Sequence, residues 1–256
     1  MNRSSRITRV DCLGEPIWHR VDHDGRRFAG KSLLHMEEVQ ESAQEWAQLP
    51  PVQPTKIICI GLNYRRHAEE MNKPLPKEPL IFMKPTSAII GSGEPIQLPA
   101  SSQDVHYEGE LAVVIASRAT AVSTADAMSH VLGFTLMNDV TARDIQRAQA
   151  RYTHAKGFDT FAPVGPAIVT GLDPAKLSIR THVNGQLRQE SSCDDMIFTI
   201  AECISFISGI MTLLPGDIIS TGTPAGVGPL HPGDVVSISI DEIGVLSNPV
   251  VASNVR

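Results

Sequence analysis

The sequence lacks a paired-cysteine pattern, a long apolar run and an excess of basic residues, and each absence excludes a class of protein. Its four cysteines stand at irregular spacing and form no C-x-x-C pair, so we predict neither a disulfide framework nor a zinc site. No segment reaches the roughly 18 consecutive apolar residues of a membrane-spanning helix. The charged N-terminus has no apolar stretch after it of the kind that directs secretion. The sequence therefore predicts a cytoplasmic protein that has no membrane partner.

The charge balance is acidic rather than basic. Lys and Arg together number 22 and Asp and Glu together number 28, which gives a formal net charge of −6. We do not expect a broad cationic surface that binds phosphate backbones, so the sequence predicts no nucleic-acid partner. With 256 residues, of which 42% are hydrophobic, the chain is long enough to bury a sizeable core.

A proline-rich segment divides the chain. Leu49 to Pro54 contains three prolines and cannot continue a helix, so we predict a small N-terminal domain over residues 1–50 and a larger domain over residues 51–256. In the first domain, Asp24-Gly25 predicts a hairpin turn and the polar stretch from Val39 to Leu49 predicts a helix.

The larger domain is rich in short strands. Strands are predicted over Lys56–Gly61, Leu80–Lys84, Glu110–Ala116, Val164–Val169, Ile218–Thr221 and Val236–Ile240. Asn184-Gly185 predicts a tight hairpin, because both residues tolerate positive φ angles. Helices are predicted over Tyr64–Met71, Thr124–His130, Ala142–Arg151 and Ile200–Leu213, with Ser123 and Thr141 as N-caps of the second and third. Since helices and strands do not alternate regularly, the pattern favours a strand-dominated α+β fold.

Three carboxylates are candidates for a metal site. Glu108 and Glu110 flank Gly109 at the start of a predicted strand, where alternation places both side chains on one side. Two like charges there either face solvent or share a hard divalent cation. Asp139 follows the apolar strand Val131–Met137 and adds a third carboxylate, although by itself it is more typical of a turn or a helix cap than of a ligand.

Two predicted helices carry further candidates, spaced three residues apart. His67 and Glu70 can hydrogen-bond to each other so that the imidazole takes a proton from water, although such a pair is more often a surface contact. Arg143 and Gln146 share a helix face that suits an anionic carboxylate, or they are ordinary exposed residues. Lys156 lies in a glycine-flanked segment and either neutralises a substrate oxyanion or is simply solvated.

Common nucleotide-binding and hydrolase motifs are missing. The glycine-rich loop Thr221–Gly228 matches neither the dinucleotide pattern nor a phosphate-binding loop, so no nucleotide cofactor is predicted. The sequence has no G-x-S-x-G elbow and no H-E-x-x-H motif, so it predicts neither a serine hydrolase nor a zinc protease.

An ordered series of motifs between residues 56 and 252 resembles the fumarylacetoacetate hydrolase family. The motifs, in chain order, are Ile60–Tyr64 with His67 and Glu70, Phe82–Pro85, His106–Leu111, Asn138–Asp144, Ala155–Asp159, Val183–Gly185, Asp195–Phe198 and Thr221–Gly228. A series of this length is far more specific than any single motif. The resemblance covers most of the chain but not the first 50 residues.

The resemblance implies a mixed β-sandwich roll as the catalytic domain, a homodimer, and Mg²⁺ or Mn²⁺ as cofactor. It implies three roles, namely metal binding by Glu108, Glu110 and Asp139, catalysis by His67, Glu70 and Lys156, and substrate binding by Arg143, Gln146 and Thr223. The implied substrate is a small 2-oxo acid or its enol.

The same resemblance leaves the reaction open. A divalent ion bound by the substrate's carboxylate and 2-oxo oxygen would stabilise a developing enolate in acylpyruvate or fumarylacetoacetate hydrolysis, oxaloacetate decarboxylation and 2-hydroxyhepta-2,4-diene-1,7-dioate isomerisation. Because His67 and Glu70 match the water-activating pair of the acylpyruvate-hydrolysing members, we predict C–C hydrolysis or decarboxylation first. Isomerisation of a hydroxymuconate-type dienoate in aromatic compound catabolism is the second prediction. A non-catalytic, metal-stabilised binding protein is the third and weakest, because every residue of the expected site is present.

Overall fold

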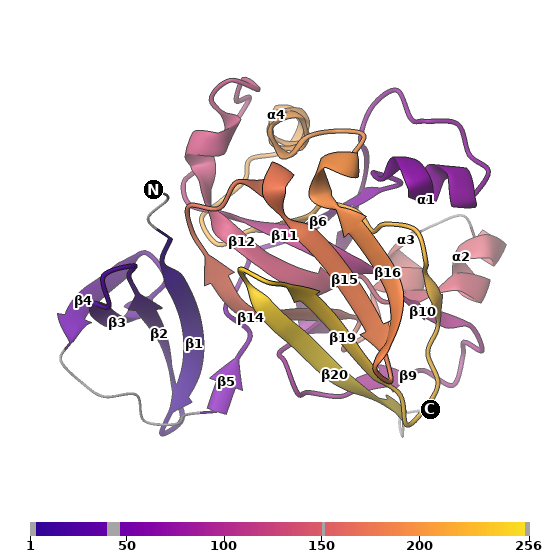
Figure 1. The fold of residues 1–256 in the computed structure, drawn as a ribbon, viewed down its shortest axis with the longest axis horizontal. Helices are drawn as coiled ribbons and strands as arrows, with labels where there is room; N and C mark the ends of the chain where they lie inside the picture. The colour runs from indigo at the N-terminus through magenta and orange to yellow at the C-terminus, as the bar shows by residue number, and fades with distance from the viewer. Residues whose placement is uncertain (1–3, 40–46, 150–151, 254–256) are drawn as a thin grey trace.

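Two large β-sheets pack against each other, and a lobe of N-terminal strands lies beside them (Figure 1). The computed structural model describes residues 4–39, 47–149 and 152–253. Four α-helices within these residues lie around the sheets, with α4 over one end and α1, α2 and α3 gathered at one side (Figure 1). The strand-dominated α+β class predicted from the sequence is confirmed.

The N-terminal lobe is a meander that continues into the main sheet. Its strands β1 to β5 span Arg6–Cys12, Glu15–Val21, Arg27–Ser32, His35–Val39 and Ala47–Leu49. The predicted hairpin at Asp24-Gly25 joins β2 to β3, and Gly25 has a φ of 84°. β1 also pairs with β14 (Ala162–Val169) of the main sheet. The lobe is thus joined to the rest by backbone hydrogen bonds, and the domain division at residue 50 stays a prediction.

The larger sheet has the strand order β4-β3-β2-β1-β14-β12-β11-β17-β6-β7. Its further strands are β6 (Ile57–Gly61), β7 (Leu80–Lys84), β11 (Gly109–Ile115), β12 (Val131–Asn138) and β17 (Ile218–Ser220), and β8 (Ile89–Ile90) pairs with β14. All residues of β11 are buried, because side chains alternate between two hydrophobic clusters: Leu111 and Val113 belong to one, and Ala112 and Val114 to the other. β11 is therefore a central strand covered on both faces.

The second sheet covers one face of the first. Its order is β16 (Gln186–Ser192), β15 (Ser178–Val183), β19 (Val235–Ile240), β20 (Gly244–Ala252) and β9 (Ile96–Leu98). Burial alternates along β15 and β19, and Ile179 and Ile238 lie in the same cluster as Leu111. The predicted Asn184-Gly185 hairpin joins β15 to β16, with φ angles of 52° and 75°. A small third sheet joins β10 (Val105–Tyr107) to β13 (Thr141–Ala142) and β18 (Gly228–Pro229).

The α-helices are short except for α4. They span Arg65–Glu70 (α1), Arg143–Gln149 (α2), Tyr152–Lys156 (α3) and Ile200–Ile210 (α4), and 3₁₀ helices span Thr86–Ala88, Ala127–His130, Pro174–Lys176 and Cys193–Asp195. A capping box begins α4, in which Thr199 Oγ1 accepts from the Glu202 amide and the Glu202 carboxylate accepts from the Thr199 amide. No helix within the described ranges is long and apolar enough to cross a membrane.

Two helix predictions are wrong in type. The described ends of the predicted helix Val39–Leu49 are strands, since Val39 ends β4 and Ala47–Leu49 form β5, which pairs with β1; the middle lies outside the described residues. Cross-strand pairing overrides the helix propensity of a polar stretch. Of the predicted helix Thr124–His130, only Ala127–His130 is helical, and it is a 3₁₀ helix.

Two further helices begin or end at residues other than those predicted. The helix predicted over Ala142–Arg151 begins at Arg143, and residues 150–151 lie outside the described ranges. Thr141 does not cap it, because Thr141 belongs to β13 and donates its hydroxyl to the Asp139 carbonyl at 2.8 Å. α4 ends at Ile210 rather than Leu213, because Leu213 pairs with Ala119 in an isolated β-bridge.

Candidate functional site

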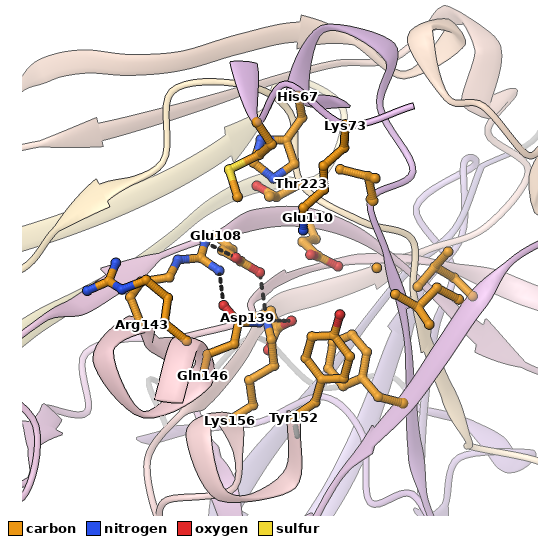
Figure 2. A pocket seen from close by; sticks show the side chains of 17 residues that line it. His67, Lys73, Glu108, Glu110, Asp139, Arg143, Gln146, Tyr152, Lys156 and Thr223 are labelled. Atoms are coloured by element: carbon orange, nitrogen blue, oxygen red, sulfur yellow. Dashed lines mark hydrogen bonds and ion pairs between the residues drawn. The ribbon is translucent and has the colours of Figure 1, made fainter. Parts of the chain in front are cut away.

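One cavity of about 410 Å³ brings the predicted site residues together (Figure 2). Its walls come from α1 and the segment after it, from β7 and β11, and from α2 and α3. The cavity is lined by eight of the nine predicted residues, namely His67, Glu108, Glu110, Asp139, Arg143, Gln146, Lys156 and Thr223. Glu70 is the ninth and contacts His67 from behind.

The three predicted metal ligands converge at the start of β11 and the end of β12. Because Gly109 pairs with Asn138 across these strands, Glu108 and Glu110 lie beside Asp139. One carboxylate oxygen from each of the three lies within 4.8 Å of the others, and all three side chains are buried. Gly109 allows this close packing, since a Cβ atom there would lie 2.2 Å from Thr181 Oγ1 of the second sheet.

Buried cations hold two of these carboxylates. Lys156 Nζ donates to Asp139 Oδ2 at 2.5 Å and to Glu108 Oε2 at 2.8 Å. Lys84 Nζ donates to Asp139 Oδ1 at 2.6 Å, and Arg143 forms an ion pair with Glu108. Burial alone would lower the pKa of Lys156, but Asp139 and Glu108 raise it above its usual value, so the ammonium stays charged.

The pKa values of Glu108 and Glu110 are shifted in opposite directions. Burial favours the neutral form of Glu108, but Arg143 and Lys156 outweigh it and hold the pKa of Glu108 below its usual value. Burial, and then the charges of Asp139 and Glu108, raise the pKa of Glu110 well above its usual value. The Glu110 Oε2 atom accepts hydrogen bonds from Ser220 Oγ and from the Gly222 amide, at 2.9 Å for the amide.

This environment fits a divalent metal ion. Three buried carboxylates supply the oxygen ligands that Mg²⁺ and Mn²⁺ prefer. Besides burial, the negative charges of Asp139 and Glu108 raise the pKa of Glu110, and a bound cation would relieve this repulsion. Glu108, Glu110 and Asp139 are therefore the residues that could hold the ion.

The His67–Glu70 pair forms as predicted. His67 Nδ1 lies 2.9 Å from Glu70 Oε2, and the imidazole is buried although it lines the cavity. This contact favours the tautomer that carries its proton on Nδ1, which leaves Nε2 as the proton acceptor. Asn63 anchors the start of α1, because its Nδ2 donates to the Thr221 carbonyl at 2.8 Å and its Oδ1 accepts from the Phe198 amide at 2.8 Å.

The predicted substrate-binding residues have partners inside the protein. Arg143 Nη1 donates to Gln146 Oε1 at 2.8 Å, while the other end of the guanidinium pairs with Glu108. Thr223 Oγ1 donates to the Gly109 carbonyl at 2.9 Å and accepts from Gln189 Nε2 at 2.8 Å. The Thr223 hydroxyl thus also fixes the glycine-rich loop to β11.

Sequence reasoning missed several residues of the site. Lys84 is buried against Asp139, and its signal was a lysine that ends the apolar strand Leu80–Lys84 just before Pro85. Phe82 and Tyr152 stack with ring centroids 4.8 Å apart and form one wall. Lys73 and Arg147 also line the cavity, and no local pattern distinguishes them from surface residues.

Comparisons with known proteins agree with this geometry. The family described as fumarylacetoacetate (FAA) hydrolase C-terminal matches residues 56–251. The mitochondrial oxaloacetate tautomerase fahd2 of Xenopus laevis is 47% identical over 234 residues, which cover 86% of this chain and 73% of that protein.

Solved structures show the same likeness. The crystal structure of 2-hydroxyhepta-2,4-diene-1,7-dioate isomerase from Mycobacterium marinum has a TM-score of 0.87 and 42% identity, and the match covers 97% of this chain and 99% of that chain. Fumarylpyruvate hydrolase from Pseudomonas aeruginosa, solved in complex with Mn²⁺ and pyruvate, has a TM-score of 0.74 and 33% identity, with 80% and 91% covered. The protein described here therefore belongs to the fumarylacetoacetate hydrolase family.

Proposed function

We propose that the protein is a Mg²⁺- or Mn²⁺-dependent enzyme that moves a proton at the carbon next to the carbonyl of a 2-oxo acid, and so interconverts its keto and enol forms. The observation that carries this proposal is the buried imidazole of His67, which contacts Glu70 and lines the same cavity as the acidic triad Glu108, Glu110 and Asp139. A proton acceptor and a cation site that share one small cavity supply the two requirements of enolisation.

The charges of the site suit an anionic substrate. Metal binding requires the three carboxylates to be ionised, and Lys84, Lys156 and Arg143 then balance them. A divalent ion held by the triad would act as a Lewis acid on the 2-oxo oxygen and would leave the site with an excess of two positive charges. This excess matches a substrate that carries one carboxylate and develops a second negative charge on the 2-oxo oxygen.

His67 is the proposed proton carrier. Its Nε2 atom takes a proton from C3 of the keto form to give an enolate, whose oxygen takes up a proton from water as the enol forms, while the imidazolium returns its proton to water. In the reverse direction the imidazolium gives a proton to C3. Glu70 keeps the imidazole in the required tautomer and stabilises the imidazolium that forms, through the 2.9 Å contact with Nδ1. The stacked rings of Phe82 and Tyr152 line the cavity, where their apolar surface would limit the access of water.

The relatives favour proton transfer over C–C hydrolysis. The Xenopus laevis protein at 47% identity is named as an oxaloacetate tautomerase, and the Mycobacterium marinum structure at 42% identity is named as an isomerase. Both names describe reactions that only relocate a proton and a double bond. We therefore place oxaloacetate-type tautomerisation ahead of the hydrolysis and decarboxylation expected from the sequence.

Hydrolysis remains the second candidate for a specific reason. The likeness to fumarylpyruvate hydrolase is 33% identity over 80% of this chain, and a buried histidine beside a metal site can also activate water. Decarboxylation uses the same developing charge and needs no nucleophile.

A parallel assay separates these reactions. Mg²⁺-loaded and Mn²⁺-loaded protein is incubated with oxaloacetate, acetylpyruvate and a 2-hydroxymuconate, and kcat/KM is measured for tautomerisation, decarboxylation, cleavage and isomerisation. We expect oxaloacetate tautomerisation to have the highest kcat/KM and to fall in His67→Ala. A higher kcat/KM for acetylpyruvate cleavage would replace the proposal with hydrolysis. If no reaction exceeds the metal-only rate, the protein is not an enzyme of these substrates.

A further inference from the structure

We propose that Lys73 binds a second carboxylate of the substrate, so that the enzyme selects 2-oxo dicarboxylates over 2-oxo acids with an uncharged tail. This inference rests on the proposed function, because it assumes that the 2-oxo end of the substrate lies at the acidic triad. It adds a specificity residue to the same cavity.

The end of α1 fixes where Lys73 leaves the backbone. Asn72 has a φ of 49°, its amide donates to the Glu69 carbonyl, and the Lys73 amide donates to the Ala68 carbonyl, both at 2.9 Å. These two bonds form a Schellman motif with Asn72 in the left-handed position, which asparagine tolerates. Lys73 is therefore held by the same helix that carries His67 and Glu70.

The side chain of Lys73 lines the cavity and extends from this turn toward its interior (Figure 2). Every other cationic group in the described lining already has an acidic partner. Arg143 pairs with Glu108, Arg147 pairs with Asp104 at 2.6 Å, Lys156 pairs with Asp139, and His67 contacts Glu70. Among the described residues, no carboxylate lies within ion-pair distance of Lys73. It is thus the lining cation that is free to pair with a ligand.

The chemistry of the substrate indicates where a second carboxylate would lie. In a four-carbon 2-oxo dicarboxylate, C3 lies between the 2-oxo carbon and the second carboxylate. The base that removes the C3 proton therefore acts on the carbon that bears this carboxylate. Lys73 follows His67 by six residues on the same segment, so one element presents both the base and a cation for the neighbouring group.

A pair of matched ligands isolates the charge of the tail. We suggest 3,3-difluoro-oxaloacetate and its 4-amide, which have no C3 hydrogen and cannot enolise, and which differ in tail charge but hardly in size. Dissociation constants for both are measured by calorimetry on the Mg²⁺-loaded protein, in low and in high salt. We expect the dicarboxylate to bind roughly 10- to 100-fold more tightly than the amide, as for other charge-assisted contacts, and the difference to shrink in high salt because Lys73 is exposed.

Lys73→Met removes the charge and keeps an apolar stem. In this variant, both ligands should bind with similar affinity, and the affinity for the amide should match the wild type. Lys77→Met is the matched control, because Lys77 is an exposed lysine of the same segment that does not line the cavity. It should keep the full preference for the dicarboxylate.

Three outcomes would overturn the inference. The first is that Lys73→Met loses affinity for the dicarboxylate and the amide equally. The second is that Lys73→Met keeps the full preference for the dicarboxylate. The third is that Arg147→Met loses this preference while Lys73→Met keeps it. The binding measurements test this inference independently of the proposed reaction. If the preference depends on Lys73 but the protein catalyses no tautomerisation, the proposed function fails and the subsite stands; if tautomerisation is found without the preference, the subsite fails and the function stands.

Discussion

The backbone amide of Gly226 donates a hydrogen bond of 3.0 Å to Oε1 of Glu70, the carboxylate whose other oxygen lies 2.9 Å from His67. The glycine-rich loop thereby holds the proposed base through one intermediate residue. Tyr107 fixes this loop in turn, because its hydroxyl donates to the Gly226 carbonyl at 2.8 Å. Catalysis by His67 should thus depend on the loop as well as on α1.

The variant Gly226→Ala tests this connection. Gly226 has a φ of 100°, and a Cβ atom would lie 2.1 Å from the Arg188 carbonyl oxygen, so the loop must shift. We expect kcat to fall by about 10- to 100-fold, a fraction of the loss caused by removing the base, with Mg²⁺ affinity unchanged by calorimetry. Gly185→Ala is the control, since Gly185 has a φ of 75° in a remote hairpin with open space around it. It should lower the melting temperature but not kcat, and a similar kcat in both variants would contradict the role of the loop.

Glu110→Gln removes a carboxylate that would bind the metal and keeps the shape of the side chain. We expect the affinity for Mg²⁺ and Mn²⁺ to fall by at least about tenfold, measured by calorimetry, while circular dichroism shows a folded protein. Glu190→Gln, an exposed carboxylate on β16, is the control and should bind metal as the wild type does. Equal affinity in wild type and Glu110→Gln would remove Glu110 from the site.

Metal binding should release a proton. The pKa of Glu110 is raised well above its usual value by burial and by the charges of Asp139 and Glu108, so below that pKa the metal-free protein keeps this carboxyl neutral. A metal ligand must be ionised, so Mg²⁺ displaces the proton and the apparent affinity rises with pH until Glu110 ionises in the metal-free protein as well. Calorimetry in two buffers with different ionisation enthalpies measures the released protons. Their number should drop in Glu110→Gln, and a pH-independent affinity would argue against this assignment.

His67 and Glu70 should behave as one unit. Loss of a general base lowers turnover by roughly 10²- to 10⁴-fold, and we expect this for His67→Ala with metal affinity preserved. Glu70→Gln should also be slower, because an amide cannot stabilise the imidazolium. Since both changes impair the same general base, kcat of the double variant should be little lower than kcat of the worse single variant. Multiplied losses in the double variant would show that the two residues act independently.

The family resemblance also predicts a homodimer. Light scattering at micromolar concentration should give twice the chain mass of 27.7 kDa. A monomer mass would contradict this prediction.

The site could be predicted where its geometry is local. The shared side of Glu108 and Glu110 follows from strand alternation, and the contact of His67 with Glu70 follows from helical spacing. The sequence places Asp139 only at the end of a strand. Its approach to Glu110 depends on the pairing of β11 with β12, which the sequence does not show. Lys84 was missed for the same reason, since a lysine at a strand end shows no partner until Asp139 is brought to it from another strand.

Helix ends were predicted less well than helices, because tertiary partners decide them. The spacing of Thr141 and Asp144 fits a capping box, yet the Asp144 carboxylate accepts from Ser102 Oγ and from the Gln103 amide instead. The position of Lys73 depends on the left-handed backbone conformation of Asn72. A single asparagine in a sequence does not predict this conformation.

Because β1 pairs with β14, the N-terminal lobe covers part of a strand edge that would otherwise be unpaired. On the side of β14 that faces away from β12, β8 covers Ala162 and Pro163 and β1 covers Ile168 and Val169. Pro166 lies between these two stretches and has no amide hydrogen to offer. A chain shortened to begin at Pro51 would expose the amides and carbonyls of Ile168 and Val169 next to apolar surface, a template for pairing with another chain. Such a fragment should self-associate through β14, even though it would keep every residue of the candidate active site.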